Sequence, residues 1–328
     1  MRVVFCGTPQ FAVPTLKHLL SQSEFEIVNV ITQPDRPRGR GMEVSSSAVK
    51  QIAAEAGLRL LQPVKIRAPE VEETLRMLQP DAIVIIAYGQ IIPGRLLSIA
   101  KLGWINLHAS LLPKYRGAAP IQWAIASGET TTGLTTMRID AGMDTGEILL
   151  QKEMKIASNE HTPELATRMA EAGAPLMAET LRGVAAGSVQ PRPQSNDQAT
   201  YAPLLTKEDG RIDWARSADE IYNRMRAFTP WPGTFTTFRG RTVHLFGEPV
   251  SSKIGGEQPA RPSSAAPPVP GVLRSNRQGL FVACGGATEL RVLSVKREGG
   301  KSVNAMEFLH GVRLTKGERF GNSQLRRS

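Results

Sequence analysis

The chain has 328 residues, 41% of them hydrophobic, and carries 40 basic against 30 acidic residues, a formal net charge of +10 at pH 7. This length predicts about two domains, and the hydrophobic fraction is large enough for each domain to bury its own core. The composition excludes collagen-like and wholly disordered chains, and no apolar run approaches the roughly 18 residues that a membrane helix needs, so no membrane partner is expected.

The cysteines and the first residues of the sequence both favour the cytoplasm. Cys6 and Cys284 are the two cysteines and lie at opposite ends of the chain, which disfavours a disulfide framework and favours reduced thiols. The first residues pass from Arg2 directly into a short strand-like run, without the long apolar core of a secretory signal. We therefore expect a cytoplasmic protein.

Short apolar runs alternate with amphipathic stretches over residues 1–189. The expected strands are Val3–Cys6, Glu26–Ile31, Ala82–Ile86, Trp104–Leu107 and Leu134–Ile139, and the expected helices are Val13–Leu20, Ala48–Ala56, Val71–Leu78, Ala118–Ala126 and Thr162–Val184. Apolar strands separated by helices are typical of a sheet covered on both faces. The sequence thus predicts a doubly wound, Rossmann-like α/β domain, in which ligands bind beyond the carboxyl ends of the strands.

A polar, proline-bearing stretch predicts a linker over residues 190–208, followed by a second domain over residues 209–328. In that domain Ala218–Phe228 is the one clear helix. The expected strands are Arg211–Asp213, Gly233–Phe238, Thr242–Phe246, Gly271–Leu273, Gly279–Ala283 and Leu290–Val295. This pattern fits a small β-barrel of the oligonucleotide-binding (OB) kind. Ser251–Pro270, rich in Ser, Pro and Ala, is expected to be a flexible loop.

The positive charge is concentrated in the C-terminal part of the chain. Residues 1–188 carry 19 basic and 18 acidic residues, whereas residues 189–328 carry 21 and 12. A nearly neutral domain followed by a basic one indicates a polyanion as partner. A solvated basic surface that maintains solubility is the alternative.

The segment Trp104–Pro113 places an amide beside an imidazole at the end of an expected strand. Residues two apart in a strand face the same side, so Asn106 and His108 should project together. Acyl transfer needs an amide donor for the developing oxyanion and an imidazole that moves a proton. Taken alone, two hydrogen-bonded polar residues at a sheet edge explain this pattern more readily.

A second candidate lies in the glycine-bearing turn of residues 140–146. Its glycines let the backbone bend sharply, so a carboxylate of the turn can reach a histidine on a neighbouring strand. Such a carboxylate would fix the imidazole tautomer and stabilise its cation. Spacing does not decide between Asp140 and Asp144, and a solvated Asp-Gly turn explains the stretch about equally well.

Longer motifs resemble a known family. The string SLLPKYRGAAPIQ at Ser110–Gln122, preceded by Asn106 and His108 and followed by Asp144-Thr145-Gly146, is similar to the folate-dependent formyltransferases. Further motifs resemble the members that act on charged tRNA: Phe5–Thr8 with Phe11-Ala12, Thr32–Gly41, Ala87-Tyr88-Gly89, Arg211–Trp214 and Arg226–Gly233. The resemblance covers nearly the whole chain.

This resemblance implies an activity and a set of site residues. The activity is transfer of the formyl group of the co-substrate 10-formyltetrahydrofolate to the α-amino group of methionyl-initiator-tRNA, for translation initiation. Asn106 would donate to the oxyanion, His108 would move protons, and Asp144 would orient and support His108. The implied folate site consists of Ser110, Leu111, Leu112 and Pro113. For the leucines, ordinary core packing is the alternative.

The resemblance also implies that the loop after the second strand contacts the acceptor end of tRNA. Its guanidinium groups, on Arg36, Arg38 and Arg40, suit phosphate contacts. Met42-Glu43 depart from the pattern, because relatives often carry lysines there. In the second domain, the basic residues that together would face the tRNA backbone are Arg224, Arg226, Arg239, Arg241, Arg274, Lys296, Arg297 and Lys301.

Three other functions stay open. They are a formyltransferase for a nucleotide-linked amino sugar, a folate-processing hydrolase of the same superfamily, and an RNA-binding protein with an inert α/β domain. The basic second domain disfavours the enzyme that acts on an amino sugar. The presence of Asn106, His108 and Asp144 disfavours the RNA-binding protein with an inert α/β domain. The scattered histidines and distant cysteines offer no metal-ligand spacing, so no metal is expected. We expect a monomer that binds initiator methionyl-tRNA and no DNA.

Overall fold

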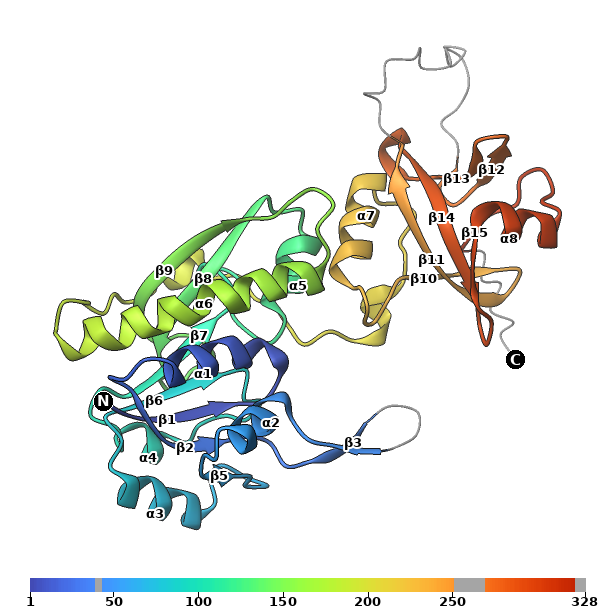
Figure 1. Cartoon of the computed structure of the whole chain (residues 1–328). Helices are drawn as coiled ribbons and strands as arrows, with labels where there is room; N and C mark the ends of the chain where they lie inside the picture. The colour runs from blue at the N-terminus through green and yellow to red at the C-terminus, as the bar shows by residue number, and fades with distance from the viewer. Residues whose placement is uncertain (39–42, 251–268, 322–328) are drawn as a thin grey trace. The chain divides into compact units, whose positions relative to one another are not determined.

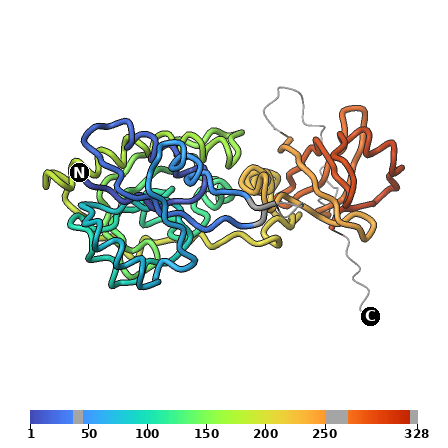
Figure 2. The backbone as a smooth tube through the Cα atoms, turned by 60° about the horizontal axis from the view of Figure 1, so that its bottom comes forward, coloured from blue at the N-terminus to red at the C-terminus, as the bar shows by residue number. Residues whose placement is uncertain are grey.

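A computed structural model describes residues 1–38, 43–250 and 269–321, which belong to two compact units (Figure 1). Unit 1 comprises Met1–Ile121, Thr130–Ser158 and Glu164–Leu204, and unit 2 comprises Gln122–Glu129, Asn159–Pro163 and Leu205–Ser328. Residues 190–204, which the sequence assigns to a linker, therefore fold within unit 1. Figure 2 traces the backbone, blue to green over most of unit 1 and orange to red over most of unit 2.

Unit 1 is built on a seven-stranded sheet of order β5-β2-β1-β6-β7-β8-β9. The strands are β1 (Arg2–Gly7), β2 (Glu26–Ile31), β5 (Leu60–Leu61), β6 (Ala82–Ile86), β7 (Trp104–His108), β8 (Thr131–Arg138) and β9 (Ile148–Lys155). Pairing is parallel from β5 to β7 and antiparallel from β7 to β9. The predicted α/β class is confirmed. The sequence interpretation missed β9, whose second half is charged and mostly exposed and so lacks an apolar period.

Helices cover both faces of this sheet. They are α1 (Val13–Leu20), α2 (Ala48–Glu55), α3 (Pro69–Leu78), α4 (Gly94–Leu97) and α6 (Thr162–Ala185), with short 3-10 turns η1 (Gln10–Ala12) and η2 (Asn196–Gln198). Helix α5 (Pro120–Ala126) begins in unit 1 and belongs mostly to unit 2. Figure 1 shows α1 and α6 on one face and α3 and α4 on the other. A small hairpin of β3 (Arg36–Arg38) and β4 (Glu43–Ser45) follows β2.

The two faces of β7 determine where the candidate site lies. Trp104 packs in the core that α3 and α4 form with the sheet. Leu107 faces the opposite way, against α6, where a Cβ on Gly173 would lie 2.5 Å from its Cδ2 atom. Side chains alternate along a strand, so Asn106 and His108 share the face of Trp104, at the carboxyl end of β7.

Unit 2 contains a six-stranded antiparallel sheet of order β10-β11-β14-β13-β12, with β15 paired to β14. The strands are β10 (Phe235–Phe238), β11 (Arg241–Pro249), β12 (Leu273–Asn276), β13 (Gly279–Ala283), β14 (Glu289–Arg297) and β15 (Ser302–Asn304). The backbone N–H of Phe320 donates to Gly271 beside β12, and that of Gly321 donates to Thr237 in β10. The end of the described chain thus connects the two edges of the sheet, as the expected barrel requires.

The helices of unit 2 are α7 (Ala218–Ala227) and α8 (Ala305–Val312), with 3-10 turns η3 (Lys207–Gly210) and η4 (Gly285–Ala287). The expectation of one helix is wrong, because α8 was missed. Its start carries a capping box, in which Asn304 and Glu307 satisfy each other's backbone N–H groups, and this signal is readable in sequence. The expected strand Arg211–Asp213 is also wrong, since only Arg211 forms a single bridge, to Phe235.

Two further expectations from the sequence concern a loop and membrane helices. Of the expected loop Ser251–Pro270, residues 251–268 lie outside the described residues. Across the described ranges, no helix combines the length and the apolar character needed to cross a membrane.

A substitution at Gly133 on β8 tests the packing that supports the end of β7. A Cβ there would lie 2.3 Å from the carbonyl oxygen of Lys152 on β9 and 2.5 Å from Leu111 Cδ2. Gly133→Ala should lower the free energy of unfolding by roughly 1–3 kcal/mol, since the neighbouring backbone must move. Gly94→Ala, where a Cβ meets no heavy atom within 4 Å, is the matched control. Equal denaturation midpoints for the two variants would contradict this packing.

Candidate active site

His108 and Asp144 meet at the carboxyl end of β7, although 36 positions separate them in sequence. His108 Nδ1 lies 3.7 Å from Asp144 Oδ2. The imidazole is 6% exposed and the carboxylate 20% exposed. This separation exceeds a hydrogen bond and suits an ion pair that forms when the imidazole gains a proton.

A backbone carbonyl fixes the tautomer of His108. The Nε2 atom lies 2.9 Å from the carbonyl oxygen of Tyr115, which can only accept a hydrogen bond. The Nε2 atom therefore carries a hydrogen, and in the neutral imidazole the lone pair is on Nδ1, facing Asp144. The sequence interpretation assumed that the carboxylate determines the tautomer, whereas in the structure the Tyr115 carbonyl determines it. The Asp144 carboxylate lies where it can stabilise the cation of the imidazole.

The structure decides between the two aspartates of the turn. Asp144 Oδ2 accepts a hydrogen bond of 2.8 Å from the backbone N–H of Gly117, which holds the carboxylate near His108. Asp140 instead accepts from the backbone N–H of Gly142 and from the Thr145 hydroxyl, both in its own turn. Asp140 stabilises the turn, and Asp144 is the carboxylate that faces the imidazole.

Asn106 supplies a neutral donor on the same face of β7. Its side chain is half-buried, and no hydrogen bond joins its amide to any other residue in the described ranges. An uncommitted amide beside an imidazole is suited to bind an oxygen that becomes negative during a reaction. The structure thus places Asn106 two residues before His108 on one face of β7, with Asp144 against the imidazole.

The segment predicted to bind folate has two different environments. Ser110 is fully buried and donates from its hydroxyl to the carbonyl of Lys114, and Leu112 packs with Met137 and Ile148. Their side chains are therefore used inside the protein. The other two side chains of the segment, Leu111 and Pro113, are half-buried.

Sequence reasoning missed a buried arginine and its partners. Arg116 is 2% exposed, and its guanidinium donates to Gln194 Oε1 and Asn196 Oδ1 at 2.8–3.0 Å. Both acceptors lie in the stretch interpreted as a linker. No local pattern predicts this contact, because about 80 residues separate the partners, but a glutamine and an asparagine among prolines are the residue types that can satisfy a guanidinium.

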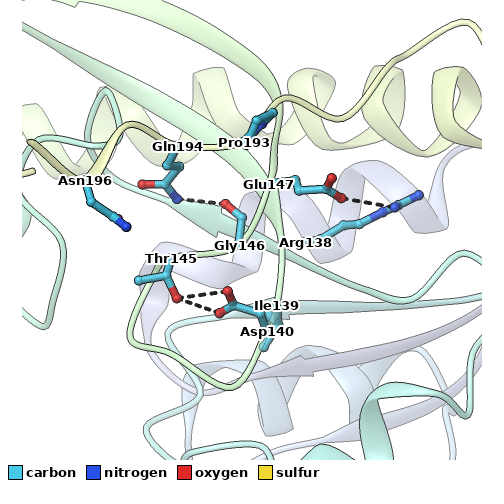
Figure 3. Close-up of a pocket in the computed structure, with 9 residues that line it drawn as sticks. All are labelled: Arg138, Ile139, Asp140, Thr145, Gly146, Glu147, Pro193, Gln194 and Asn196. Atoms are coloured by element: carbon cyan, nitrogen blue, oxygen red, sulfur yellow. Dashed lines mark hydrogen bonds and ion pairs between the residues drawn. The ribbon is translucent and has the colours of Figure 1, made fainter. Parts of the chain in front are cut away.

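A pocket of about 470 Å³ lies where this stretch meets the turn that carries Asp144 (Figure 3). Its lining comprises Arg138, Ile139, Asp140, Thr145, Gly146, Glu147, Pro193, Gln194 and Asn196. In Figure 3 the amide of Gln194 points to the carbonyl of Gly146, and the Thr145 hydroxyl points to the Asp140 carboxylate. The pocket is therefore bordered by groups that shape the turn next to Asp144.

Two sequence profiles match the chain. Residues 1–181 match the formyl transferase profile, and residues 204–313 match the profile of the formyl transferase C-terminal domain. The chain belongs to the formyl transferase family. The family predicted from the motifs is confirmed.

Full-length relatives of this formyl transferase are known. The methionyl-tRNA formyltransferase of Solibacter usitatus is 50% identical over 326 residues, which cover 99% of this chain and 100% of that relative. The methionyl-tRNA formyltransferase of Acidobacterium capsulatum is 50% identical over 322 residues, which cover 98% and 100%.

Solved structures share the fold of this formyl transferase. An N-formyltransferase from Helicobacter canadensis, in complex with folinic acid and dTDP-3-aminofucose, superposes with a TM-score of 0.60 at 16% identity, covering 88% of this chain and 98% of its own. The methionyl-tRNA formyltransferase from Clostridium thermocellum superposes with a TM-score of 0.53 at 16% identity, covering 78% and 95%. At such identities these likenesses concern the fold alone.

The arginine loop of this formyl transferase, which carries Arg36, Arg38 and Arg40, is described in part. Arg36 is exposed on β3, the backbone of Arg38 belongs to the same strand, and Arg40 lies outside the described residues. At the base of the hairpin, Asp35 accepts from the ammonium of Lys50 and the amide of Gln62. The hydrogen bond from Lys50, followed by that from Gln62, lowers the pKa of Asp35. The base of the loop is thus anchored to helix α2.

The basic residues of unit 2 are of two kinds. Arg226 is buried and donates to the carbonyl of Glu160 and to Asn223, so its expected place on a tRNA-binding surface is wrong. Arg239 forms an ion pair with Glu318, and its guanidinium also donates to the carbonyl of Val312. The exposed members of the expected set include Arg241, Lys296 and Lys301.

No metal-binding group is found in the described ranges of this formyl transferase, where no three His, Cys, Asp or Glu side chains gather.

Proposed function

We propose that the chain transfers the formyl group of 10-formyltetrahydrofolate to the α-amino group of methionyl-initiator-tRNA. The observation that carries this proposal is the 50% identity over nearly the whole chain to relatives named methionyl-tRNA formyltransferase. The arrangement of Asn106, His108 and Asp144 supports it, because it supplies an oxyanion donor and a base. The proposed setting is the cytoplasm, and the proposed active form is a monomer that requires no metal and binds neither DNA nor a membrane.

The reaction needs one bond formed, one bond broken and one proton moved. The formyl donor supplies an electrophilic carbonyl carbon, which forms a bond to the α-amino nitrogen and loses its bond to the folate nitrogen. The amide of Asn106 donates to the carbonyl oxygen while it carries negative charge. His108 accepts the proton of the attacking amine on Nδ1 and returns it to the departing folate nitrogen.

Asp144 makes this proton transfer favourable. When Nδ1 gains a proton, the imidazolium faces a carboxylate at 3.7 Å and still donates from Nε2 to Tyr115. The demand on the base is modest, because an α-amino group has a pKa of about 7.7–8.0, and an appreciable neutral fraction exists near pH 7. Positioning the amine and stabilising the oxyanion are therefore the main tasks of the site.

The folate donor is proposed to bind at Ser110, Leu111, Leu112 and Pro113. Leu111 and Pro113 are half-buried, which suits apolar contact with a flat ring, while the buried Ser110 and Leu112 hold the shape of the segment. The Leu112 backbone is fixed on both sides: its N–H donates to the Thr135 hydroxyl, and its carbonyl accepts from the Gln151 amide.

The arginine loop, with Arg36, Arg38 and Arg40, is proposed to contact the acceptor end of the tRNA. Arg40→Ala should lower kcat/KM for methionyl-tRNA on the order of tenfold, the size expected from one charge-assisted hydrogen bond. Arg59→Ala, at an exposed position of the same unit, is the matched control. Steady-state formylation at varied tRNA concentration measures both variants, and equal values would remove Arg40 from recognition.

An acceptor competition tests the proposed substrate. The chain is supplied with 10-formyltetrahydrofolate and a mixture of charged methionyl-tRNA and an amino-sugar nucleotide of the kind bound by the Helicobacter canadensis structure. Mass spectrometry should find formyl-methionine on the tRNA and an unchanged sugar. A formylated sugar would support the alternative function, and formate release without either product would indicate a hydrolase.

A further inference from the structure

The side chain of Gln194 joins two loops that hold the candidate catalytic pair. Its Nε2 donates to the backbone carbonyls of Asp144 and Gly146, each at 2.8 Å. Its Oε1 accepts from Nε and Nη2 of Arg116, at 3.0 and 2.8 Å. One amide group therefore takes part in four hydrogen bonds to residues about 50 and 78 positions away.

Arg116 is placed between the two backbone groups that hold His108 and Asp144. The preceding residue, Tyr115, accepts from His108 Nε2, and the following residue, Gly117, donates to Asp144 Oδ2. A Cβ on Gly117 would lie 2.7 Å from the carbonyl oxygen of Ala202, so this loop is closely packed. Movement of the Arg116 guanidinium would displace both backbone groups.

Asp144 needs external support for its backbone. Its φ of 53° is in the left-handed region, which costs a residue other than glycine roughly 1–2 kcal/mol. The donation from Gln194 to the Asp144 carbonyl holds this conformation from outside the turn. Without it, the turn can relax toward more common dihedral angles and withdraw the carboxylate from His108.

We propose that Gln194 is a positioning residue for formyl transfer, which bridges the Arg116 loop and the Asp144 turn and so keeps the carboxylate against His108. This inference rests on the proposed function. Gln194 acts through Asp144 and touches no reacting atom. It lies within unit 1, in a stretch whose composition is that of a linker.

The fold itself depends little on this glutamine. Arg116 keeps Asn196 Oδ1 as an acceptor for Nη1 and Nη2 when Gln194 is removed. Gln194 is only half-buried and borders the pocket of Figure 3, so water can reach the released carbonyls. A change at residue 194 is thus expected to alter geometry more than stability.

The test is a double-mutant cycle under single-turnover conditions with saturating 10-formyltetrahydrofolate and methionyl-tRNA. Gln194→Ala should slow formyl transfer on the order of 10- to 100-fold, as a small misplacement of a catalytic group does, with little change in KM. In an Asp144→Asn background the same change should slow the reaction less than about threefold, because the carboxylate it positions is already gone. Gln198→Ala, exposed in the same stretch, is the matched control.

A second pair of variants separates positioning from folding. Gln194→Glu keeps an acceptor for Arg116 but cannot donate to the Asp144 and Gly146 carbonyls, so it should be as slow as Gln194→Ala while melting near the wild-type temperature. Equal slowing by Gln194→Ala in both backgrounds, or wild-type rates for Gln194→Glu, would overturn the proposal.

A spectroscopic readout keeps this proposal distinct from the proposed function. In ¹⁵N-histidine-labelled protein, Gln194→Ala should shift the imidazole resonances of His108, and Gln198→Ala should not. A wild-type chain that formylates no tRNA would overturn the proposed function, and the resonances would still test the positioning. Unchanged His108 resonances in Gln194→Ala would overturn the role of Gln194.

Discussion

His108→Ala is expected to lower the single-turnover rate of formyl transfer by roughly 10²- to 10⁴-fold, the range that general acid–base catalysis contributes. The imidazole is a base that the structure places against the Asp144 carboxylate. Its Nε2 is committed to the Tyr115 carbonyl, so Nδ1 is the atom that takes the proton. Alanine removes this atom and leaves the amine without an acceptor.

The affinity for tRNA should change little in His108→Ala, because the imidazole is buried at the reacting end of the site. Filter binding of methionyl-tRNA measures this affinity. His18→Ala on α1, also in unit 1, is the matched control and should keep wild-type rates. A His108→Ala variant that retains most of its activity would contradict the assigned role.

Asp144→Asn should lower the single-turnover rate by up to about 10³-fold, the fold-change that corresponds to losing about 4 kcal/mol of charge stabilisation. Asparagine can still accept from the Gly117 N–H through Oδ1, so the turn keeps its shape. The imidazolium, however, loses the negative charge 3.7 Å away. At an effective dielectric constant of about 20, the interaction between such a pair of charges contributes about 4 kcal/mol. The variant lacks this stabilisation when the imidazole takes up the proton.

Asp140→Asn is the matched control for this prediction. Asp140 accepts from Gly142 and Thr145 within its own turn, and asparagine preserves an acceptor for these donors. Its rate should stay within about threefold of wild type, as for a residue without a reacting partner. If Asp140→Asn is slower than Asp144→Asn, the assignment of the carboxylate is wrong.

The sequence predicts the parts of the fold that local apolar patterns determine. β2, β6, β13 and α1 begin and end where their patterns predict. β9 was missed because its outward residues are charged, and α8 because a short helix with a capping box was not recognised as one. The first error concerns a strand whose burial depends on neighbours that are distant in sequence, and the second concerns a local signal that the sequence does contain.

The candidate site shows the same limit. The alternation of side chains along a strand is enough to place Asn106 and His108 on one face. The choice of Asp144 over Asp140 depends on which carboxylate accepts the hydrogen bond from the Gly117 N–H, and only the structure shows this. Gln194 could not be found from local composition, because its partners belong to other loops. Arg116, a cation close to the segment that is proposed to bind folate, is instead buried and bonded to Gln194 and Asn196.

The central claim is that this chain forms formyl-methionyl-tRNA with the site at the end of β7. The most direct test is a single-turnover reaction with a labelled formyl group on 10-formyltetrahydrofolate and charged initiator methionyl-tRNA, comparing wild type with Asn106→Ala. The account predicts labelled formyl-methionine with the wild type, none with uncharged tRNA, and a rate lowered roughly 10²- to 10³-fold in the variant, the loss expected for one oxyanion donor. Absence of labelled formyl-methionine, or an Asn106→Ala rate equal to that of the wild type, would contradict it.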